Sequence, residues 1–446
     1  MPIALLPELA ALDVASDGVR IPPGVTVPLT PRVRALLDTA EVRRLARVGQ
    51  LGLVSLVYPG AVHSRLEHSL GVYRLALEFL ARLGRDGRFA AAVGPDDAAA
   101  FVAAALLHDV GHWPWCHPIE DMGLPGIPRH ESLVRGILSG SAAGRVLERD
   151  WGLDPGRVAS LIEGTARDPA GRILASLLSG PVDVDKMDYL ARDSLHAGVP
   201  YGRNFDQDRL LASLCLDEAG SALAITDKGR TAAELLVFAR YVMFSEVYWH
   251  HAVRAATAML QRAVWVVRDR LDVPALVRSD DASCAAILRA AAAGTPAAPL
   301  LDGLFGPVRR LYKRVAAWDA AGSPALHRAL AGRPHAAMAA VSARLAGLVS
   351  ARLGRPVAAD DLLIDAPPAE KEVEFRLQVR VAPSRGAGGS PAWRPLEDLS
   401  PVVRSLAREQ FDDLVKRVRV FADPEMAEAV AGCDGLEALV VEAAAG

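Results

Sequence analysis

Twenty residues, 98–117, decide how the sequence is interpreted, and they read "AAAFVAAALLHDVGHWPWCH". The first ten are apolar, as in a helix that crosses the centre of a core. Gly111 and Pro114 end that pattern, while three histidines and an aspartate follow the apolar run directly. An unpartnered imidazole or carboxylate is costly to bury. These residues therefore indicate a chemical site at the end of a buried helix.

Composition narrows the class of protein. The chain has 446 residues, of which 51% are hydrophobic, and a formal net charge of −3. This length corresponds to two or three globular domains of about 100–200 residues each. The charge provides no overall attraction to an anionic membrane or to nucleic acid, although a local basic pocket stays open. The four cysteines are widely spaced, and the start of the chain lacks a basic n-region, so we expect a soluble cytoplasmic protein.

Periodicity predicts a mainly α fold with a smaller C-terminal α/β region. We expect an extended arm or hairpin over 1–31, a helical core over 32–290 and the α/β region over 291–446. The boundary follows from the glycine and proline residues near 292–308. Within these regions we expect helices at 64–84, 96–109, 184–196 and 229–270, and strands at 371–383 and 417–422.

His68 and the pair His108-Asp109 are candidate metal ligands. On its own, His68 is more simply explained as a core histidine that is hydrogen-bonded to a carbonyl group. His108-Asp109 changes this, because it adds one nitrogen and one oxygen ligand on a rigid support, a mixture that suits Fe, Mn, Ni, Co or Zn. The segment "VDVDKMDYLARD" (182–193) offers further carboxylates. On a helix, one face would hold Asp185, Lys186, Tyr189 and Asp193.

Five motifs in order resemble the HD-domain metal-dependent phosphohydrolases, and within them the deoxynucleoside triphosphate (dNTP) triphosphohydrolases, which include dGTPase-like enzymes and vertebrate enzymes with a SAM domain. They are the spaced H…HD…D set, "HSRLEHSLGVYRLA" (63–76), "HDVGHWPWCHPIED" (108–121), "RHESL" (129–133) and "DVDKMDYLARD" (183–193). The resemblance covers roughly residues 32–260 and implies an HD-domain helical core. It implies His68, His108, Asp109 and Asp185 as ligands of a divalent transition metal.

The resemblance also implies the residues that contact the substrate, a dNTP with Mg²⁺ on its triphosphate. Phosphate contacts would come from Arg65, Lys186, Tyr189 and Arg240, and sugar contacts from Gln50, Leu51, Asp193 and Tyr248. Catalytic residues would be His112, His117, Glu120 and His130. Among these we assign His117 as the proton donor to the departing 5′-oxygen.

Departures from the family leave some features open. Trp249 replaces a glutamine that contacts the base, and Trp113 is expected to narrow the pocket mouth. Asp38 matches an aspartate of the activating nucleotide site, but Ala46 stands where relatives have a basic residue, so allosteric activation by a nucleotide stays open. The family also implies a homo-oligomer, from dimer to hexamer.

The leading hypothesis is hydrolysis of a dNTP to a deoxynucleoside and inorganic triphosphate. One alternative is an HD phosphohydrolase that acts on another nucleotide, such as a monophosphate or an alarmone-like molecule. The other is a nucleotide-sensing or nucleic-acid-binding scaffold with a vestigial site. The complete ligand set argues against a vestigial site.

Overall fold

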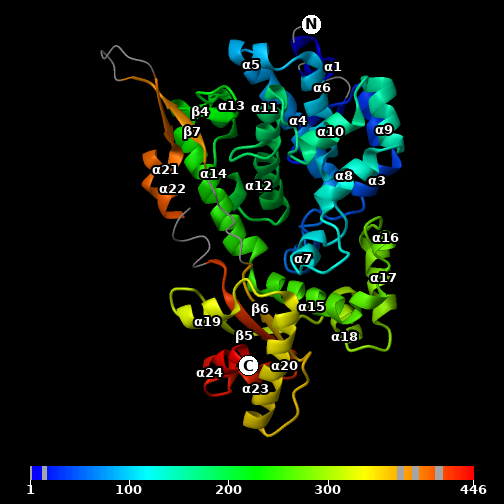
Figure 1. Cartoon of the computed structure of the whole chain (residues 1–446), viewed down its shortest axis with the longest axis vertical. Coiled ribbons are helices and arrows are strands. Elements are labelled where there is room, and N and C mark those ends of the chain that lie inside the picture. Colours follow the sequence, from blue (N-terminus) through cyan, green and yellow to red (C-terminus); the bar gives the residue numbers. More distant parts are fainter. Residues whose placement is uncertain (1–2, 13–17, 369–375, 384–390, 407–414) are drawn as a thin grey trace.

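The computed structural model describes residues 3–12, 18–368, 376–383, 391–406 and 415–446. Helices dominate, and three small sheets accompany them in these ranges. Figure 1 shows the N-terminus at one end of the long axis and the C-terminus in a lobe toward the other end. The mainly α fold with a smaller C-terminal α/β region is confirmed.

Most of the elements in the upper part of Figure 1 belong to the first 248 residues, and β7, described below, joins them there. They are α1 (Pro7–Leu12), β1 (Gly18–Ile21), β2 (Val25–Pro28), α2 (Pro31–Leu37), α3 (Ala40–Leu45), α4 (Arg65–Leu83), α5 (Gly87–Ala92), α6 (Pro95–Leu107), α7 (Cys116–Glu120), α8 (His130–Leu138), α9 (Ala142–Val146), α10 (Pro155–Ile162), α11 (Pro169–Leu178), α12 (Val184–His196), α13 (Gln207–Ser213), β3 (Leu214–Leu216), β4 (Leu223–Thr226) and α14 (Arg230–Met243). Short turns η2 (Gly52–Leu56), η3 (His108–Gly111) and η7 (Phe244–Tyr248) connect some of them.

The remaining elements follow from residue 251. They are α15 (His251–Val267), α16 (Val273–Leu276), α17 (Asp281–Ala292), α18 (Ala298–Phe305), β5 (Lys313–Trp318), α19 (Pro324–Leu330), α20 (His335–Leu353), β6 (Leu362–Asp365), β7 (Gln378–Val381), β8 (Ala392–Pro395), α21 (Leu396–Leu399), α22 (Pro401–Ser405), β9 (Val418–Ala422), α23 (Ala427–Ala431) and α24 (Leu436–Ala445).

Three helices form the support for the site, and local sequence explains where each begins. The Ser64 hydroxyl accepts a hydrogen bond from the Glu67 amide at the start of α4. Pro95 occupies the first turn of α6, where its missing N–H costs nothing. The Asp183 carboxylate accepts from the Lys186 amide at the start of α12. α4 packs against both α6 and α12 inside the largest apolar cluster.

The predicted helix over 229–270 is interrupted. The amide of Trp249 donates to the carbonyl of Phe244 at 2.8 Å, which makes Phe244–Tyr248 a wide π-helical turn. Such turns are common at functional sites because they redirect side chains. α14 and α15 consequently run in different directions (Figure 1).

The N-terminal segment contains the expected hairpin and also a short helix that the sequence analysis did not predict. β1 and β2 pair antiparallel. α1 is held by Glu8, a fully buried carboxylate that accepts from the Thr30 hydroxyl at 2.7 Å and pairs with Arg32.

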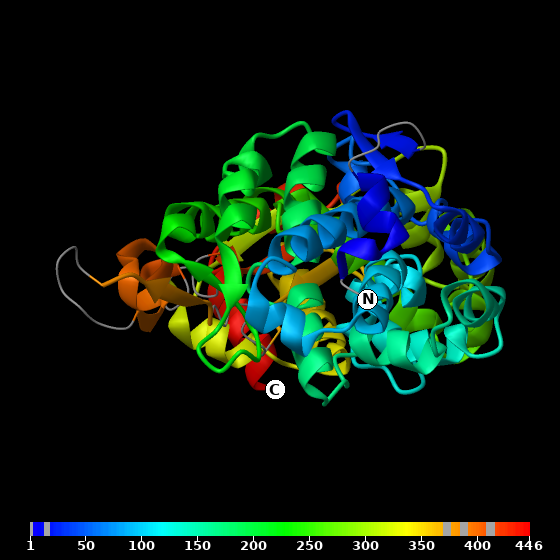
Figure 2. The ribbon, with the colours of Figure 1, turned by 90° about the horizontal axis from the view of Figure 1, so that it is seen from above.

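The C-terminal residues contribute to two sheets. β5, β9 and β6 form one antiparallel sheet in the lobe, where α20 and α24 pack together. β7 instead pairs parallel with β4, so that β7 and β8 extend a sheet that begins in the first half. The two figures agree in placing α21 and α22 beside this sheet (Figures 1 and 2). The predicted strand over 371–383 is present as β7, although its residues 371–375 lie outside the described ranges.

α20 is, within the described ranges, the one helix long and apolar enough to cross a membrane. One third of its apolar window is buried, and Val341 and Leu345 pack in the cluster of the lobe. A core helix passes the same test, so this helix is weak evidence for a membrane span.

Candidate metal centre and nucleotide cavity

Four side chains from three elements converge where α4, α6 and α12 meet. His68 comes from α4, His108 and Asp109 from η3, and Asp185 from α12. Nε2 of His68 lies 3.2 Å from Nε2 of His108 and 3.0 Å from Oδ1 of Asp185. Oδ1 of Asp109 lies 3.5 Å from Nε2 of His108. Ligands that bind one ion at about 2.1 Å and at right angles lie about 3 Å apart. The spacing of His68, His108 and Asp185 therefore fits one divalent metal ion, and Asp109 lies beside this group.

The hydrogen bonds behind the two histidines also fit a metal ion. Nδ1 of His108 lies 2.9 Å from the carbonyl oxygen of Ala105, and Nδ1 of His68 lies 2.8 Å from Oδ2 of Asp188. Each of these acceptors fixes a proton on Nδ1, so Nε2 is the nitrogen that each ring turns toward the other ligands. The two Nε2 atoms and the carboxylates require a cation between them, either a metal ion or a proton on His68.

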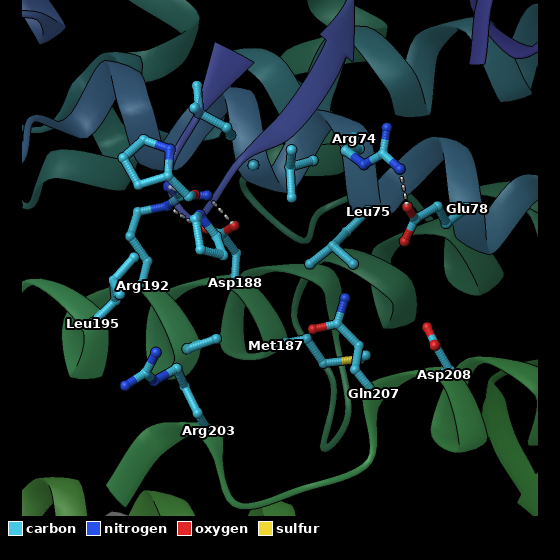
Figure 3. Close-up of a pocket in the computed structure, with 16 residues that line it drawn as sticks. Arg74, Leu75, Glu78, Met187, Asp188, Arg192, Leu195, Arg203, Gln207 and Asp208 are labelled. Carbon is cyan, nitrogen blue, oxygen red and sulfur yellow. Dashed lines mark hydrogen bonds and ion pairs between the residues drawn. The ribbon is translucent and has the colours of Figure 1, made fainter. Parts of the chain in front are cut away.

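A chain of ion pairs holds Asp188, and it begins with Arg192, which lies one helical turn further along α12. Arg192 donates from Nε and Nη2 to the two oxygens of Asp188 at 2.8 and 2.7 Å, and its Nη1 reaches Glu67 at 2.8 Å. Figure 3 shows Asp188 and Arg192 at one side of a cavity of about 330 Å³, called the rear cavity below, with the Arg74–Glu78 pair at the other side. Gly71 is required beside them, because a Cβ atom there would lie 1.9 Å from Oδ1 of Asp188.

The electrostatics of the site favour bound positive charge. Burial opposes the charged form of His68, but hydrogen bonds to Asp185 and Asp188 outweigh it and raise the pKa of His68 to about 10. Burial alone would raise the pKa of Asp109, but the charges of His112 and Arg65 hold that pKa well below its ordinary value. Arg65 donates to Asp109 at 3.0 Å, and Nδ1 of His112 lies 3.0 Å from the other oxygen of Asp109.

The remaining predicted catalytic residues form a cluster beside the four ligands. The rings of His112 and His130 have centroids 3.8 Å apart, and those of His117 and His130 are 4.9 Å apart. Glu120 accepts from the His130 amide at 2.9 Å, and its Oε2 lies 3.0 Å from Nδ1 of His130. The surrounding protein, and then the charge of Arg65, lower the pKa of His117 to about 4, while part of its ring is open to solvent at the cavity.

A cavity of about 420 Å³ opens in front of these groups. Its lining includes the four predicted ligands, the predicted histidines, and Gln50, Arg65, Tyr189, Asp193 and Tyr248. A second cavity of about 440 Å³ adjoins it and shares several of these residues. The shared residues are Gln50, Arg65, His117, Phe244 and Tyr248. The pair of cavities has one end with the predicted metal ligands and one end with Trp115 and Trp249.

Some predicted residues lie away from the cavity walls. Lys186 donates to Oδ2 of the buried Asp183 at 2.7 Å and does not line either of these two cavities. Arg240 also lies outside the lining, although its charge acts on Tyr189 and Tyr248. Trp113 was expected to narrow the mouth. This expectation is wrong, because Trp113 is fully buried in the second apolar cluster.

Trp115 occupies the place expected for Trp113. It lines the adjoining cavity and has a left-handed backbone conformation, with φ of 53°. Its ring stacks on Phe305 with centroids 4.5 Å apart. Pro114 signals a bend here, but the sequence does not say which of the two tryptophans faces the cavity.

The C-terminal lobe supports the far wall of the adjoining cavity. Asp365 of β6 accepts two hydrogen bonds from Arg254 of α15, and Arg254 lies 4.4 Å from the centre of the Trp249 ring. Arg419 of β9 donates to the carbonyl oxygen of Trp249 at 3.1 Å. Trp249 and Arg254 both line the cavity, so residues far apart in the chain form this wall together.

Comparisons with known proteins identify the family to which the chain belongs. The sequence profile of the HD domain matches residues 65–193, and that of the HD associated region matches residues 205–444. The fold and the ligand geometry define a metal-binding HD domain. The chain therefore belongs to the HD-domain phosphohydrolase family, in the group that carries the HD associated region.

Curated relatives match part of the chain. An uncharacterised protein of Bacillus subtilis is 36% identical over 230 residues, which are 51% of this chain and 50% of the relative. The human deoxynucleoside triphosphate triphosphohydrolase SAMHD1 is 27% identical over 279 residues, which are 55% of this chain and 44% of the relative. The chain thus spans about half the length of the curated relatives it matches.

Solved structures share the fold over nearly the whole chain. A phosphohydrolase from Bacteroides thetaiotaomicron has a TM-score of 0.66 at 21% identity, with 91% of this chain and 99% of that chain covered. A hypothetical protein from Aquifex aeolicus has a TM-score of 0.65 at 23% identity, with 91% and 96% covered.

Proposed function

We propose that the protein hydrolyses dNTPs to a deoxynucleoside and inorganic triphosphate with a bound divalent metal ion. The observation that carries this proposal is the junction of the two cavities. One end presents metal ligands and basic groups, the other presents Trp115 and Trp249, and Phe244 lies where the two cavities meet. A nucleotide has the same polarity, with a charged triphosphate at one end and an aromatic base at the other. The relationship to SAMHD1 supports this substrate class.

His68, His108, Asp109 and Asp185 would hold the metal. Their mixture of imidazole and carboxylate suits Fe, Mn, Ni, Co or Zn, and Mg²⁺ would accompany the triphosphate. When bound, such a cation supplies Lewis acidity and makes a water molecule nucleophilic near neutral pH. Arg65 would neutralise charge on the phosphate next to the sugar, because its guanidinium lines both cavities beside Asp109. Lys186, Tyr189 and Arg240 would act on the remaining phosphates.

His117 would protonate the departing 5′-oxygen. Its pKa of about 4 in the free protein means that the ring is neutral at pH 7. The negative charge of a bound triphosphate would raise that pKa, so His117 would gain its proton together with the substrate. Glu120 would orient His130, which with His112 faces the same phosphate.

Gln50 and Leu51 would select the sugar. The Oε1 atom of Gln50 is buried and lacks a hydrogen-bond partner within the described residues, so it can accept from a hydroxyl group. Leu51 lines the adjoining cavity next to it, where its side chain would exclude a 2′-hydroxyl. Asp193 would contribute less freely, because its two oxygens already bond to His63 at 3.0 Å and to the Tyr248 hydroxyl at 2.7 Å.

Incubation with each of the four dNTPs and Mn²⁺ or Mg²⁺, with and without GTP, tests the proposal. Chromatography should show a deoxynucleoside and intact triphosphate in equal amounts. Release of pyrophosphate or of monophosphate alone would contradict it and favour another nucleotide substrate. Stimulation by GTP would establish an allosteric nucleotide. Asp38→Asn, an exposed change at the end of α2, tests whether that site is involved.

We also propose a cytoplasmic homo-oligomer. The four cysteines are free and buried, as in a protein of a reducing compartment. Light scattering during gel filtration would measure the number of subunits, and a monomer at working concentration would contradict this assignment.

A further inference from the structure

Cys116 lies among the histidines of the catalytic cluster, although none of the roles proposed above uses it. Ligand atoms of His112, Cys116 and His117 all lie within 4.8 Å of one another. The same holds for Cys116, Glu120 and His130. Cys116 is 1% exposed and borders the adjoining cavity. A thiol therefore lies within 4.8 Å of ligand atoms of three histidines and of Glu120 at the wall of the cavity.

The histidines of this cluster have ring nitrogens available for a metal ion. Nδ1 of His112 is buried and makes no hydrogen bond within the described residues, although Oδ1 of Asp109 lies 3.0 Å away. Nδ1 of His130 lies 3.0 Å from Oε2 of Glu120. A histidine whose Nδ1 carries the proton offers Nε2 as a ligand. The His117 ring makes contact with the other two rings and has no hydrogen-bond partner in the described part of the chain.

We propose that Cys116, with His112 and His117, binds a soft divalent cation such as Zn²⁺ or Cd²⁺, at a site separate from the four-ligand centre. Thiolate and imidazole select such ions, whereas the HD ligands offer only nitrogen and oxygen. Bond lengths of about 2.3 Å to sulfur and 2.0 Å to nitrogen place these ligand atoms roughly 3.5 Å apart. Movements of the side chains by about 1 Å would therefore bring the three ligand atoms to bonding distance from one ion. Binding replaces the thiol proton, which passes to solvent, and no electron is transferred.

The charges beside this site favour a cation. Asp109 and Glu120 stand next to the ligands and offset the positive charges of Arg65 and Arg44, whose guanidinium groups also act on the cluster. The bound cation would engage His112 and His117, the residues assigned to the phosphate and the leaving oxygen. Soft cations should consequently inhibit hydrolysis, a step that rests on the proposed function, whereas binding itself does not.

Titration of the Mn²⁺-loaded protein with Cd²⁺ tests the binding. We expect an ultraviolet charge-transfer band from the cadmium–thiolate bond that saturates at one equivalent. In Cys116→Ser the band should vanish and the affinity should fall by at least about 100-fold, because the sulfur ligand is lost. Cys284→Ser is the matched control, since it removes another buried thiol of the same apolar cluster. His117→Ala keeps the thiol, so the band should remain, but the affinity for Cd²⁺ should fall because one nitrogen ligand is lost.

Two outcomes would overturn the site. One is a wild-type protein without the band, and the other is a band that survives in Cys116→Ser. A parallel assay measures dNTP hydrolysis against Cd²⁺ or Zn²⁺, with each variant compared with its own rate before addition. The Cd²⁺ or Zn²⁺ concentration that halves the rate should be at least about tenfold higher for Cys116→Ser than for Cys284→Ser. A band without any dNTP hydrolysis would leave the site standing and reject the proposed function. A band together with undiminished hydrolysis would contradict the expectation that a cation bound at Cys116 inhibits hydrolysis.

Discussion

Asp188 contacts the predicted metal ligand His68 from the side away from the other ligands, and removal of its charge should weaken metal binding. Its carboxylate lies 2.8 Å from Nδ1 of His68, where it fixes the tautomer and raises the basicity of the ligand nitrogen. Loss of such a partner typically costs about 10–100-fold in metal affinity, or about 1.4–2.8 kcal/mol. Asp188→Asn keeps an acceptor oxygen, so we expect a loss near tenfold. Asp188→Ala should approach 100-fold.

Isothermal titration of the metal-stripped protein with Mn²⁺ measures this loss. The matched control is Asp208→Asn, since Asp208 lines the same rear cavity as Asp188 (Figure 3) without a bond to His68. Thermal unfolding of the metal-free variants separates a binding defect from a folding defect, because Arg192 keeps Glu67 as a partner. Wild-type affinity in a folded Asp188→Ala protein would refute the reasoning.

Three further predictions address other parts of the molecule. Asp109→Ala should abolish both bound transition metal and turnover, as measured by metal analysis and triphosphate release, and an active variant would contradict the ligand assignment. Leu51→Gly should admit ribonucleotides, so the ratio of kcat/KM for dNTP over NTP should fall by at least about tenfold; an unchanged ratio would reject the sugar gate. The third concerns His335. Burial lowers its pKa to about 4, so the unfolded chain binds more protons between pH 4 and 6.5, and stability should fall as the pH falls through this window. Denaturant unfolding of His335→Gln should lose less stability there than the wild type, by up to about 3 kcal/mol, and parallel pH curves would contradict the assignment.

The sequence predicted those parts of the site that depend on short-range pattern. Helix periodicity and caps located α4 and α12, and the His108-Asp109 pair at the end of an apolar run marked the metal centre. The side-chain period of a helix placed Asp185, Tyr189 and Asp193 on one face, and all three line the cavity. The same reasoning did not find that Lys186 turns toward Asp183, because a local ion pair competes with a distant ligand.

What the sequence missed depends on contacts between distant residues. Asp188 looked like one of several carboxylates in a charged helix, and only the packing of α4 on α12 brings it to Nδ1 of His68. The π-helical turn at Phe244–Tyr248 has no simple sequence signal, yet it divides the predicted helix and turns Tyr248 and Trp249 toward the cavities. The choice between Trp113 and Trp115 depends on one left-handed residue.

The anchoring of Arg254 and Trp249 by Asp365 and Arg419 limits how this protein can be shortened or varied. A fragment that stops at residue 290 would expose an aromatic wall and strip a buried arginine of its counter-charge. Under the proposed function, changes in the lobe would alter which bases the protein accepts while every residue near the metal ligands stays the same. A difference in base preference between related chains would then trace to β6 and β9, which support the far wall of the adjoining cavity.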